Sequence, residues 1–412
     1  MVTKRAPDAE ALIRLSSKPA DSVEHFSVFN HAFRPFFLLA GVWAALPLAI
    51  WVLVLAGVFA FPIGWGAMLW HGHEMVFGFV PAALAGFLLT AVPKWTGTPR
   101  VQGRALVALV AVWVAGRVAL LAAGSLSPWL VAGLDLLFLP LLAGFVLAPI
   151  VKARRARNYG FPVLLLLLAG ANGLTHLSAL GLASSTTLLG LRMGVYVEVA
   201  SVLVVGGRIV PNFTEAAFRR AGRDVVLWRS VALDRLSLIA ALLALTVDLA
   251  ASGPLAGGLC ALAGLLLLVR LAGWRGLSAL KDPLVSVLHL GLLFVVAGFG
   301  ARAVFNFGLA SAGTAPLHLF TAGALGVMVL AVMSRASLGH TGRPLEASRG
   351  LTLSYVLVIL GALTRGLLPY AGGVLALRAP MVGGSLWALG YLLFVILYWP
   401  ILMRPRLDGK PG

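Results

Sequence analysis

The sequence predicts an all-α integral membrane protein with about twelve transmembrane helices and with both chain ends in the cytoplasm. Hydrophobic residues make up 60% of the 412 positions and charged residues only 11%, so most of the chain needs lipid around it. The apolar segments are roughly 20 residues long, the length that crosses about 30 Å of hydrocarbon. The formal net charge is +18, but Lys and Arg gather in the short segments between the apolar ones, which indicates membrane topology and not nucleic-acid binding.

Twelve apolar segments, bounded by turn residues or charge clusters, are predicted to be the helices. The first follows a polar tail and lacks a small-residue cleavage site, so it is expected to be retained and not removed as a signal peptide. The expected parts of the chain are a cytoplasmic tail at 1–35, a membrane domain at 36–403 and a second cytoplasmic tail at 404–412. The predicted helices are 36–60, 66–92, 104–123, 129–151, 160–181, 188–207, 230–248, 256–274, 283–307, 315–334, 350–369 and 379–403.

The charge of the loops predicts their side of the membrane. Segments 93–104, 152–159, 208–229, 270–282 and 335–349 carry 3, 4, 5, 3 and 3 Lys or Arg, whereas the alternate loops carry none. Basic loops stay in the cytoplasm, so the loops after even-numbered helices are expected inside. The aromatic stretch Phe33–Phe37 is expected to anchor the chain at the interface where it enters the lipid.

Ionisable side chains within the predicted helices are the strongest sign of a functional site, because each costs several kcal/mol in hydrocarbon. A buried group satisfied by nearby backbone explains any one of them alone, but not so many at one depth. With the orientation above, almost all lie in the outward half of the membrane. They are His71, His73, Glu74, Arg117, Asp135, Asn172, His176, Arg192, Tyr196, Glu198, Arg302, Asn306, His318 and Arg365.

A combination of histidines and arginines at one depth favours a buried b-type haem. Imidazoles ligate transition metals, and arginines pair with haem propionates without losing their charge. Arg302 and Arg365 are the first candidates for propionate partners, followed by Arg192 and Arg117. The single cysteine, Cys260, lies in an apolar segment, which excludes a covalent c-type attachment and a cage of paired cysteines.

A haem iron at this depth can be reached by His71 or His73, by His176 and by His318. His318 is the preferred axial ligand, because Ala322 and Gly323 are small and are expected to leave space beside it for a flat macrocycle. His176 is the alternate, and His73 is a further cofactor-binding candidate. His289 lies about 10–15 Å further inward by helical rise, which makes it a candidate for a second cofactor.

The segment Trp70–Met75 holds two histidines, a carboxylate and a thioether. At about 100° per residue, Glu74 and Met75 are expected on the side of His71, whereas His73 points almost the opposite way. The two histidines should therefore serve different partners. The candidate metal ligands are His71, His73, Glu74, Met75, His176 and His318.

Several short motifs surround these residues and extend over nearly the whole chain. They are Phe33–Leu38, Trp70–Gly78, Gly86–Pro93 with Trp95–Gly97, Trp113 with Gly116–Arg117, Arg208 with Pro211 and Phe213–Thr214, Leu288–Gly291, and His318 with Gly323–Ala324 and Met333–Pro344. Taken together, these motifs resemble the NnrS family. Two positions depart mildly from the family pattern as it is known: Leu292 stands where an aromatic is preferred, and Ser334 where Thr is preferred.

The resemblance implies a multi-pass protein of the bacterial cytoplasmic (inner) membrane that contains haem and copper and takes part in the nitric oxide response. We expect it to bind or convert nitric oxide, or a related nitrogen oxide, under nitrosative stress. One of His71 and His73 would then serve copper and the other haem. The expected partners are the lipid bilayer and a small neutral gas, with no nucleic acid.

A secondary transporter of a metal or small anion is the alternative. The longest loop, 208–229, divides the predicted helices six and six, as in many transporters. The shortage of acids within the helices for proton or sodium coupling weighs against it. A purely structural role would leave the polar residues at one depth unexplained.

Overall fold

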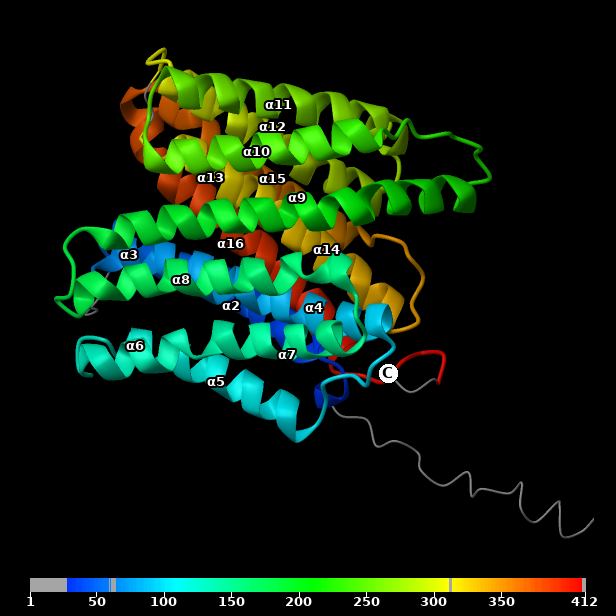
Figure 1. The fold of residues 1–412 in the computed structure, drawn as a ribbon, viewed down its shortest axis with the longest axis horizontal. Helices are drawn as coiled ribbons and strands as arrows, with labels where there is room; N and C mark the ends of the chain where they lie inside the picture. The colour runs from blue at the N-terminus through cyan, green and yellow to red at the C-terminus, as the bar shows by residue number, and fades with distance from the viewer. Residues whose placement is uncertain (1–27, 59, 61–63, 311–312, 410–412) are drawn as a thin grey trace, which may run out of the picture.

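The computed structural model describes residues 28–58, 60, 64–310 and 313–409. All regular secondary structure in these ranges is helical, and it forms twelve long rods that run roughly parallel (Figure 1). The predicted all-α fold is therefore confirmed, and the chain is a multi-pass membrane protein by the length and composition of its helices. The cytoplasmic location of the two chain ends stays a prediction. Most of the predicted cytoplasmic tail, residues 1–27, lies outside the described residues.

The first six rods lie within residues 33–220. They are α2 (Phe33–Leu55), α3 (Ala67–His73) joined through η2 (Glu74–Phe79) to α4 (Val80–Thr96), α5 (Arg104–Leu121), α6 (Pro128–Leu136) continued by α7 (Phe138–Lys152), α8 (Gly160–Ala179) and α9 (Thr186–Arg220).

The second six rods lie within residues 231–402. They are α10 (Val231–Ala250), α11 (Pro254–Gly273), α12 (Pro283–Asn306), α13 (Ala315–His318) joined through η5 (Leu319–Leu325) to α14 (Gly326–His340), α15 (Arg349–Leu367) and α16 (Gly373–Leu402). Short 3₁₀ turns occur at η1 (Val28–Asn30), η3 (Ala156–Asn158), η4 (Gly276–Ala279) and η6 (Leu368–Ala371).

Eleven of the rods are apolar enough to span a membrane by composition alone, and α10 is the one that is not. It carries Asp234 and Asp248, and both are paired in the fold. Asp234 Oδ1 lies 2.6 Å from Nε of Arg270, and Asp248 Oδ1 lies 2.5 Å from Nη2 of Arg302. Paired charges cost much less to bury than isolated ones, which fits α10 as the twelfth span.

The start of α2 and the end of α16 lie together, as an even number of crossings requires. Arg34 is fully buried and donates from Nη1 to the carbonyl oxygens of Leu402, at 2.7 Å, and Arg404, at 2.8 Å. It thereby satisfies carbonyls that a helix end leaves without partners. Phe33, Phe36 and Phe37 are at most 1% exposed, so these rings pack against protein and do not face the lipid interface as the sequence prediction had them.

The sixth rod is longer than predicted. The apolar pattern ends near residue 207, but α9 continues to Arg220. Its last turns remain helical because Ala217 and Phe218 pack into a small apolar cluster with Leu227, Ala279 and Val285. The first part of the predicted central loop is therefore helical.

The two most buried spans, α3–η2–α4 and α13–η5–α14, each contain a π-helical turn. Such wide turns are rare and frequently lie at functional sites. Each begins directly after a histidine: η2 follows His73, and η5 follows His318. Gly78 permits close packing at η2, because a Cβ there would come within 2.8 Å of the Trp43 ring and 2.9 Å of Arg117 Nη1.

Candidate functional site

A fully buried group of polar side chains, which we call the His73 cluster, joins four rods of the first half. Every member is at most 3% exposed. The cluster consists of His73, Glu74, Arg117, Asp135, Asn172 and His176.

Asp135 is the centre of the His73 cluster. Its Oδ2 accepts from Nε2 of His176 and from Nδ2 of Asn172, both at 2.8 Å. His73 Nε2 lies 3.3 Å from the same oxygen and 2.8 Å from Oδ1 of Asn172. Both imidazoles therefore direct Nε2 at the same carboxylate.

Arg117 holds the two carboxylates in place. Nη1 donates to both carboxylate oxygens of Glu74, at 3.1 and 3.0 Å, and Nη2 donates to Oδ1 of Asp135. The indole of Trp43 adds a donor to Glu74. Glu74 Oε1 in turn lies 3.4 Å from Nδ1 of His73, so the ring of His73 has a carboxylate near each nitrogen.

The charges of the ionised groups in the His73 cluster do not sum to zero. With Glu74 and Asp135 ionised, Arg117 charged and both imidazoles neutral, one negative charge remains in a buried site. An uncompensated buried charge is costly. Either a second proton on an imidazole or a bound cation would remove the imbalance.

Three groups in this cluster lie close enough together that they could hold a metal ion. One donor atom each from His73, Asp135 and His176 lie within 4.8 Å of one another, and all three residues are buried. A His, carboxylate and His donor set suits divalent and monovalent transition metals. The remaining contacts to Asn172 and Glu74 are of the kind that orient such ligands.

A second group, which we call the His318 cluster, joins α3, α13 and α15. It contains His71, His318 and Arg365. His318 and Arg365 both bond to Thr314, and His71 lies within electrostatic range of both. Nδ1 of His318 lies 2.8 Å from the carbonyl oxygen of Thr314. A carbonyl only accepts, so Nδ1 carries the hydrogen and Nε2 keeps a lone pair for a metal.

Two polar atoms of the His318 cluster are buried without a partner. They are Nδ1 of His71 and Nε of Arg365. Arg365 donates from Nη2 to the hydroxyl of Thr314 at 2.8 Å, and no carboxylate pairs with it among the described residues. The His71 ring stacks on Trp51, with centroids 4.5 Å apart and an interplanar angle of 17°. A ligand with carboxylates and a metal would fit this donor set.

A third group, the Asp248 cluster, contains Arg192, Tyr196, Asp248, Arg302 and Asn306. Arg302 forms a two-pronged pair with Asp248, with Nη2 at 2.5 Å and Nε at 3.1 Å from the carboxylate oxygens. Asn306 donates to the same carboxylate at 2.5 Å, and Arg192 Nη2 lies 3.3 Å away. Tyr196 donates to it as well.

The four arginines predicted as partners of haem propionates differ in whether they already pair with a carboxylate of the chain. Arg117, Arg192 and Arg302 each have a carboxylate of the chain as partner, and Arg365 has none among the described residues. Their role toward a cofactor stays a prediction. Of the four, Arg365 is the one whose charge is free for an external carboxylate.

His71 and His73 do face different partners, as their angular spacing predicts. Glu74, however, lies with His73 and not with His71. The physical reason is the π-helical turn that begins at Glu74, because it changes the angle per residue that an α-helix would have. Met75 is partly buried and packs against the hydrophobic core.

The sequence-based argument for His318 as a haem ligand was that small residues leave space beside it, and at Gly323 this is wrong. A Cβ at Gly323 would lie 2.5 Å from the ring of Phe294, so the space at this glycine is filled by that ring and not left for a macrocycle.

His289 lies apart from all three clusters: its Nε2 is 2.9 Å from Thr214 Oγ1, and its ring packs against Gly276.

Two residues that organise the clusters were not assigned a site role from the sequence. Asp135 is predicted only as one of many ionisable residues in the outward half, and Asp248 is not singled out, yet each is the acceptor at the centre of its cluster. The position of each aspartate along its own helix does not indicate that it lies at the centre of a cluster. The available signal was their charge sign, because a carboxylate at the depth of several buried arginines is expected to pair with one.

Comparison with known proteins adds one match. A family model described as NnrS protein matches residues 27–406. No curated protein matches the chain.

Proposed function

Because this chain belongs to the NnrS family, we propose that it is a haem- and copper-binding protein of the bacterial cytoplasmic membrane that binds or converts nitric oxide during nitrosative stress. The observation that carries the proposal is the buried set of His73, Asp135 and His176, whose donor atoms lie within 4.8 Å of one another. The His318 cluster supplies a second, separate set of donors.

The His73 cluster is proposed as the copper site. Its single excess negative charge would be neutralised by one Cu⁺, whereas the carboxylates and the guanidinium stay paired. A metal ion bound at Nε2 would use the lone pair of that nitrogen, so each neutral imidazole would carry its hydrogen on Nδ1; in His73 that nitrogen lies 3.4 Å from Oε1 of Glu74. The indole of Trp65 contacts both imidazoles edge-on, with centroids 5.2 and 5.0 Å away, which limits their rotation.

The His318 cluster is proposed as the site of haem b. Nε2 of His318 would be the axial donor, held by the bond from Nδ1 to the carbonyl of Thr314, and Arg365 would pair with a propionate. Haem iron, when bound, would supply the open coordination position for nitric oxide.

Spectra and metal analysis of the purified protein test the proposal. Protein expressed with a haem precursor should show a Soret band, and His318→Ala should lose haem or change its coordination. His340→Ala is the matched control, because His340 lies beside Lys94 at the end of α14, where Lys94 Nζ is 3.3 Å from its ring. A colourless preparation would refute the haem assignment. A wild-type Soret band in His318→Ala would show that His318 is not the axial ligand.

Copper is tested separately. His73→Ala and His176→Ala should each lower the copper content measured by elemental analysis, whereas His289→Ala should not, since His289 bonds to Thr214 away from the cluster. Full copper content in both cluster variants would exclude this site.

The transporter alternative gains no support from three of the acids within the helices. Glu74, Asp135 and Asp248 each pair with an arginine, which leaves them poorly suited to coupling by proton or sodium exchange.

A further inference from the structure

Glu198 differs from the other acids inside the helices. It lies in the middle of α9, is 1% exposed, and neither carboxylate oxygen has a hydrogen-bond partner. An ionised carboxylate in such a place, with no cation or donor nearby, would be prohibitively costly. The side chain is therefore a neutral carboxylic acid in the resting protein.

Glu198 is one of the residues that line a cavity of about 60 Å³, and its two carboxylate oxygens are themselves buried beside it. The cavity is several times the roughly 10–15 Å³ that one water molecule needs. The cavity lies between α4, α9 and α14, and the end of η5 also contributes to it. Leu84, Val202 and Val332 line it and are only partly buried, so it opens between these helices toward the lipid.

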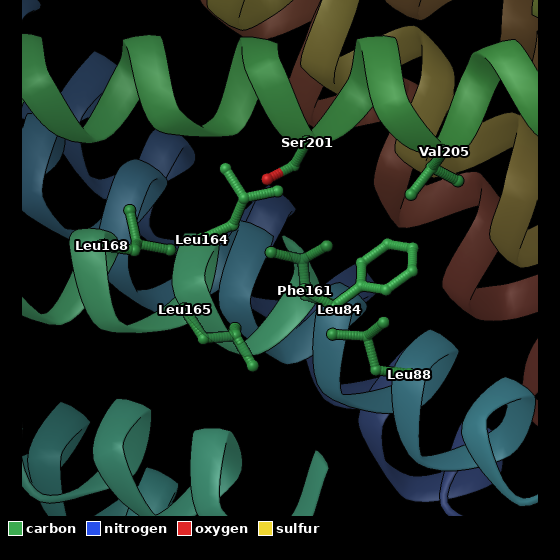
Figure 2. A pocket seen from close by; sticks show the side chains of 8 residues that line it. All are labelled: Leu84, Leu88, Phe161, Leu164, Leu165, Leu168, Ser201 and Val205. Atoms are coloured by element: carbon green, nitrogen blue, oxygen red, sulfur yellow. The ribbon is translucent and has the colours of Figure 1, made fainter. Parts of the chain in front are cut away.

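No second titratable group faces Glu198 in this cavity. The side chains contributed by α2, α4, η5 and α14 are apolar, and the remaining polar one is Ser201 of α9. Its hydroxyl donates to the carbonyl of Val197 at 2.9 Å. A smaller apolar pocket continues on the α8 side of Ser201 and shares Leu84 and Val205 with the first (Figure 2).

The cavity also lies beside both π-helical turns. A Cβ at Gly194, one turn before Glu198, would come within 2.6 Å of Val76 in η2. On the other side, the ring of Tyr196 lies 6.3 Å from that of Phe320 in η5. α9 thus packs between the two turns that follow His73 and His318. Charges buried inside a protein are screened much less than exposed ones.

We propose that Glu198 is an intramembrane proton-exchange site, which holds one proton in a lipid-facing cavity and releases it when positive charge accumulates at the His73 or His318 cluster. As that charge appears, the carboxyl group of Glu198 gives its proton to a water molecule that enters the cavity, and the carboxylate takes a proton back from water when the charge is removed; Glu198 transfers no electron. The coupling to the clusters rests on the proposed function, whereas the proton site itself does not.

Chemical labelling tests the proton site without any cofactor. Dicyclohexylcarbodiimide is lipid-soluble and reacts with protonated carboxyl groups, so purified protein in lipid vesicles should be labelled at Glu198, even at mildly alkaline pH, as located by peptide mass spectrometry. Labelling should be lost in Glu198→Gln and kept in Ser201→Ala, the matched change within the same cavity. Failure of the lipid-soluble reagent to label Glu198, or its labelling by a water-soluble carbodiimide, would overturn the proposal.

A redox titration tests the coupling in preparations that contain haem. The haem midpoint potential should fall as pH rises, by up to about 59 mV for each tenfold change in proton concentration if one electron is coupled to one proton. Glu198→Gln should flatten this slope, and an unchanged slope would refute the coupling. If no haem is present, the proposed function fails while the labelling result still decides the proton site.

Discussion

Replacing Asp248 by Asn tests whether the Asp248 cluster holds the second half of the bundle together. The substitution keeps the size of the side chain and removes its charge. Arg302 would then keep a positive charge with a side chain only 8% exposed and no carboxylate in reach. Arg192 is 29% exposed and can recover part of its hydration.

The expected cost follows from burial. Removing one partner of a buried ion pair lowers the free energy of unfolding by about 3–5 kcal/mol. The pair between Arg192 and Asp248 contributes less than about 1 kcal/mol of this, because Arg192 is partly exposed. We therefore expect Asp248→Asn to lower the free energy of unfolding by about 3 kcal/mol, roughly a hundredfold in the equilibrium constant. The bond from Asn306 is also weakened, because an amide is a poorer acceptor than a carboxylate.

Glu215→Gln is the matched control. Glu215 Oε1 lies 2.7 Å from Nη2 of Arg229, but the two side chains are 32% and 39% exposed. Such a pair contributes less than about 1 kcal/mol. Both variants can be measured by denaturation with sodium dodecyl sulfate in mixed micelles, with helical content followed by circular dichroism.

A second substitution removes the unpaired charge. Asp248→Asn combined with Arg302→Met should lose less stability than the sum of the two single variants, because buried partners are coupled. Equal losses in Asp248→Asn and Glu215→Gln, or strict additivity in the double variant, would refute the conclusion that Asp248 is the buried counter-ion of Arg302.

Three further predictions concern packing, pH and topology. Gly78→Ala should displace the arginine of the His73 cluster and lower both stability and copper content, whereas Gly300→Ala, where a Cβ meets nothing within 4 Å, should do neither; equal effects in the two would contradict the packing argument. Burial and then neighbouring arginine charges lower the pKa of His31, outside the spans, from 6.5 to about 3, so the unfolded chain takes up the proton first and stability should fall as pH falls from about 6.5 to about 3. His31→Gln should reduce that loss in pH-dependent denaturation, and an unchanged pH profile would count against it. Reporter fusions after Ser184 should be periplasmic and those after Arg155 cytoplasmic; a cytoplasmic signal at Ser184 would reverse the predicted topology.

Much of the architecture could be predicted because hydrocarbon thickness fixes helix length. Apolar segments alone located all twelve rods, with errors mainly at their ends. The largest error was at α9, which continues to Arg220. Its extension is held by contacts with residues of other elements, such as Leu227 and Val285, and hydropathy along one segment carries no signal of these.

The candidate site could be predicted as a set of residues but not as an arrangement. The cost of polar groups in lipid marks His73, His176, His318 and the arginines from sequence alone. Their division into clusters could not be predicted, because Arg302 pairs with Asp248 of another rod, 54 residues away in the chain. Helix periodicity orients a side chain around its own axis but does not say which helix packs against it.

The sequence by itself therefore determined the membrane fold, the number of spans and the chemistry available inside them, since each follows from the free energy of placing a side chain in hydrocarbon. The tertiary structure decided which groups meet. It placed Asp135 between His73 and His176, left Arg365 beside His318 without a carboxylate among the described residues, and enclosed Glu198 without a partner. These outcomes depend on helix packing and on two π-helical turns, and both arise from contacts between residues far apart in the chain.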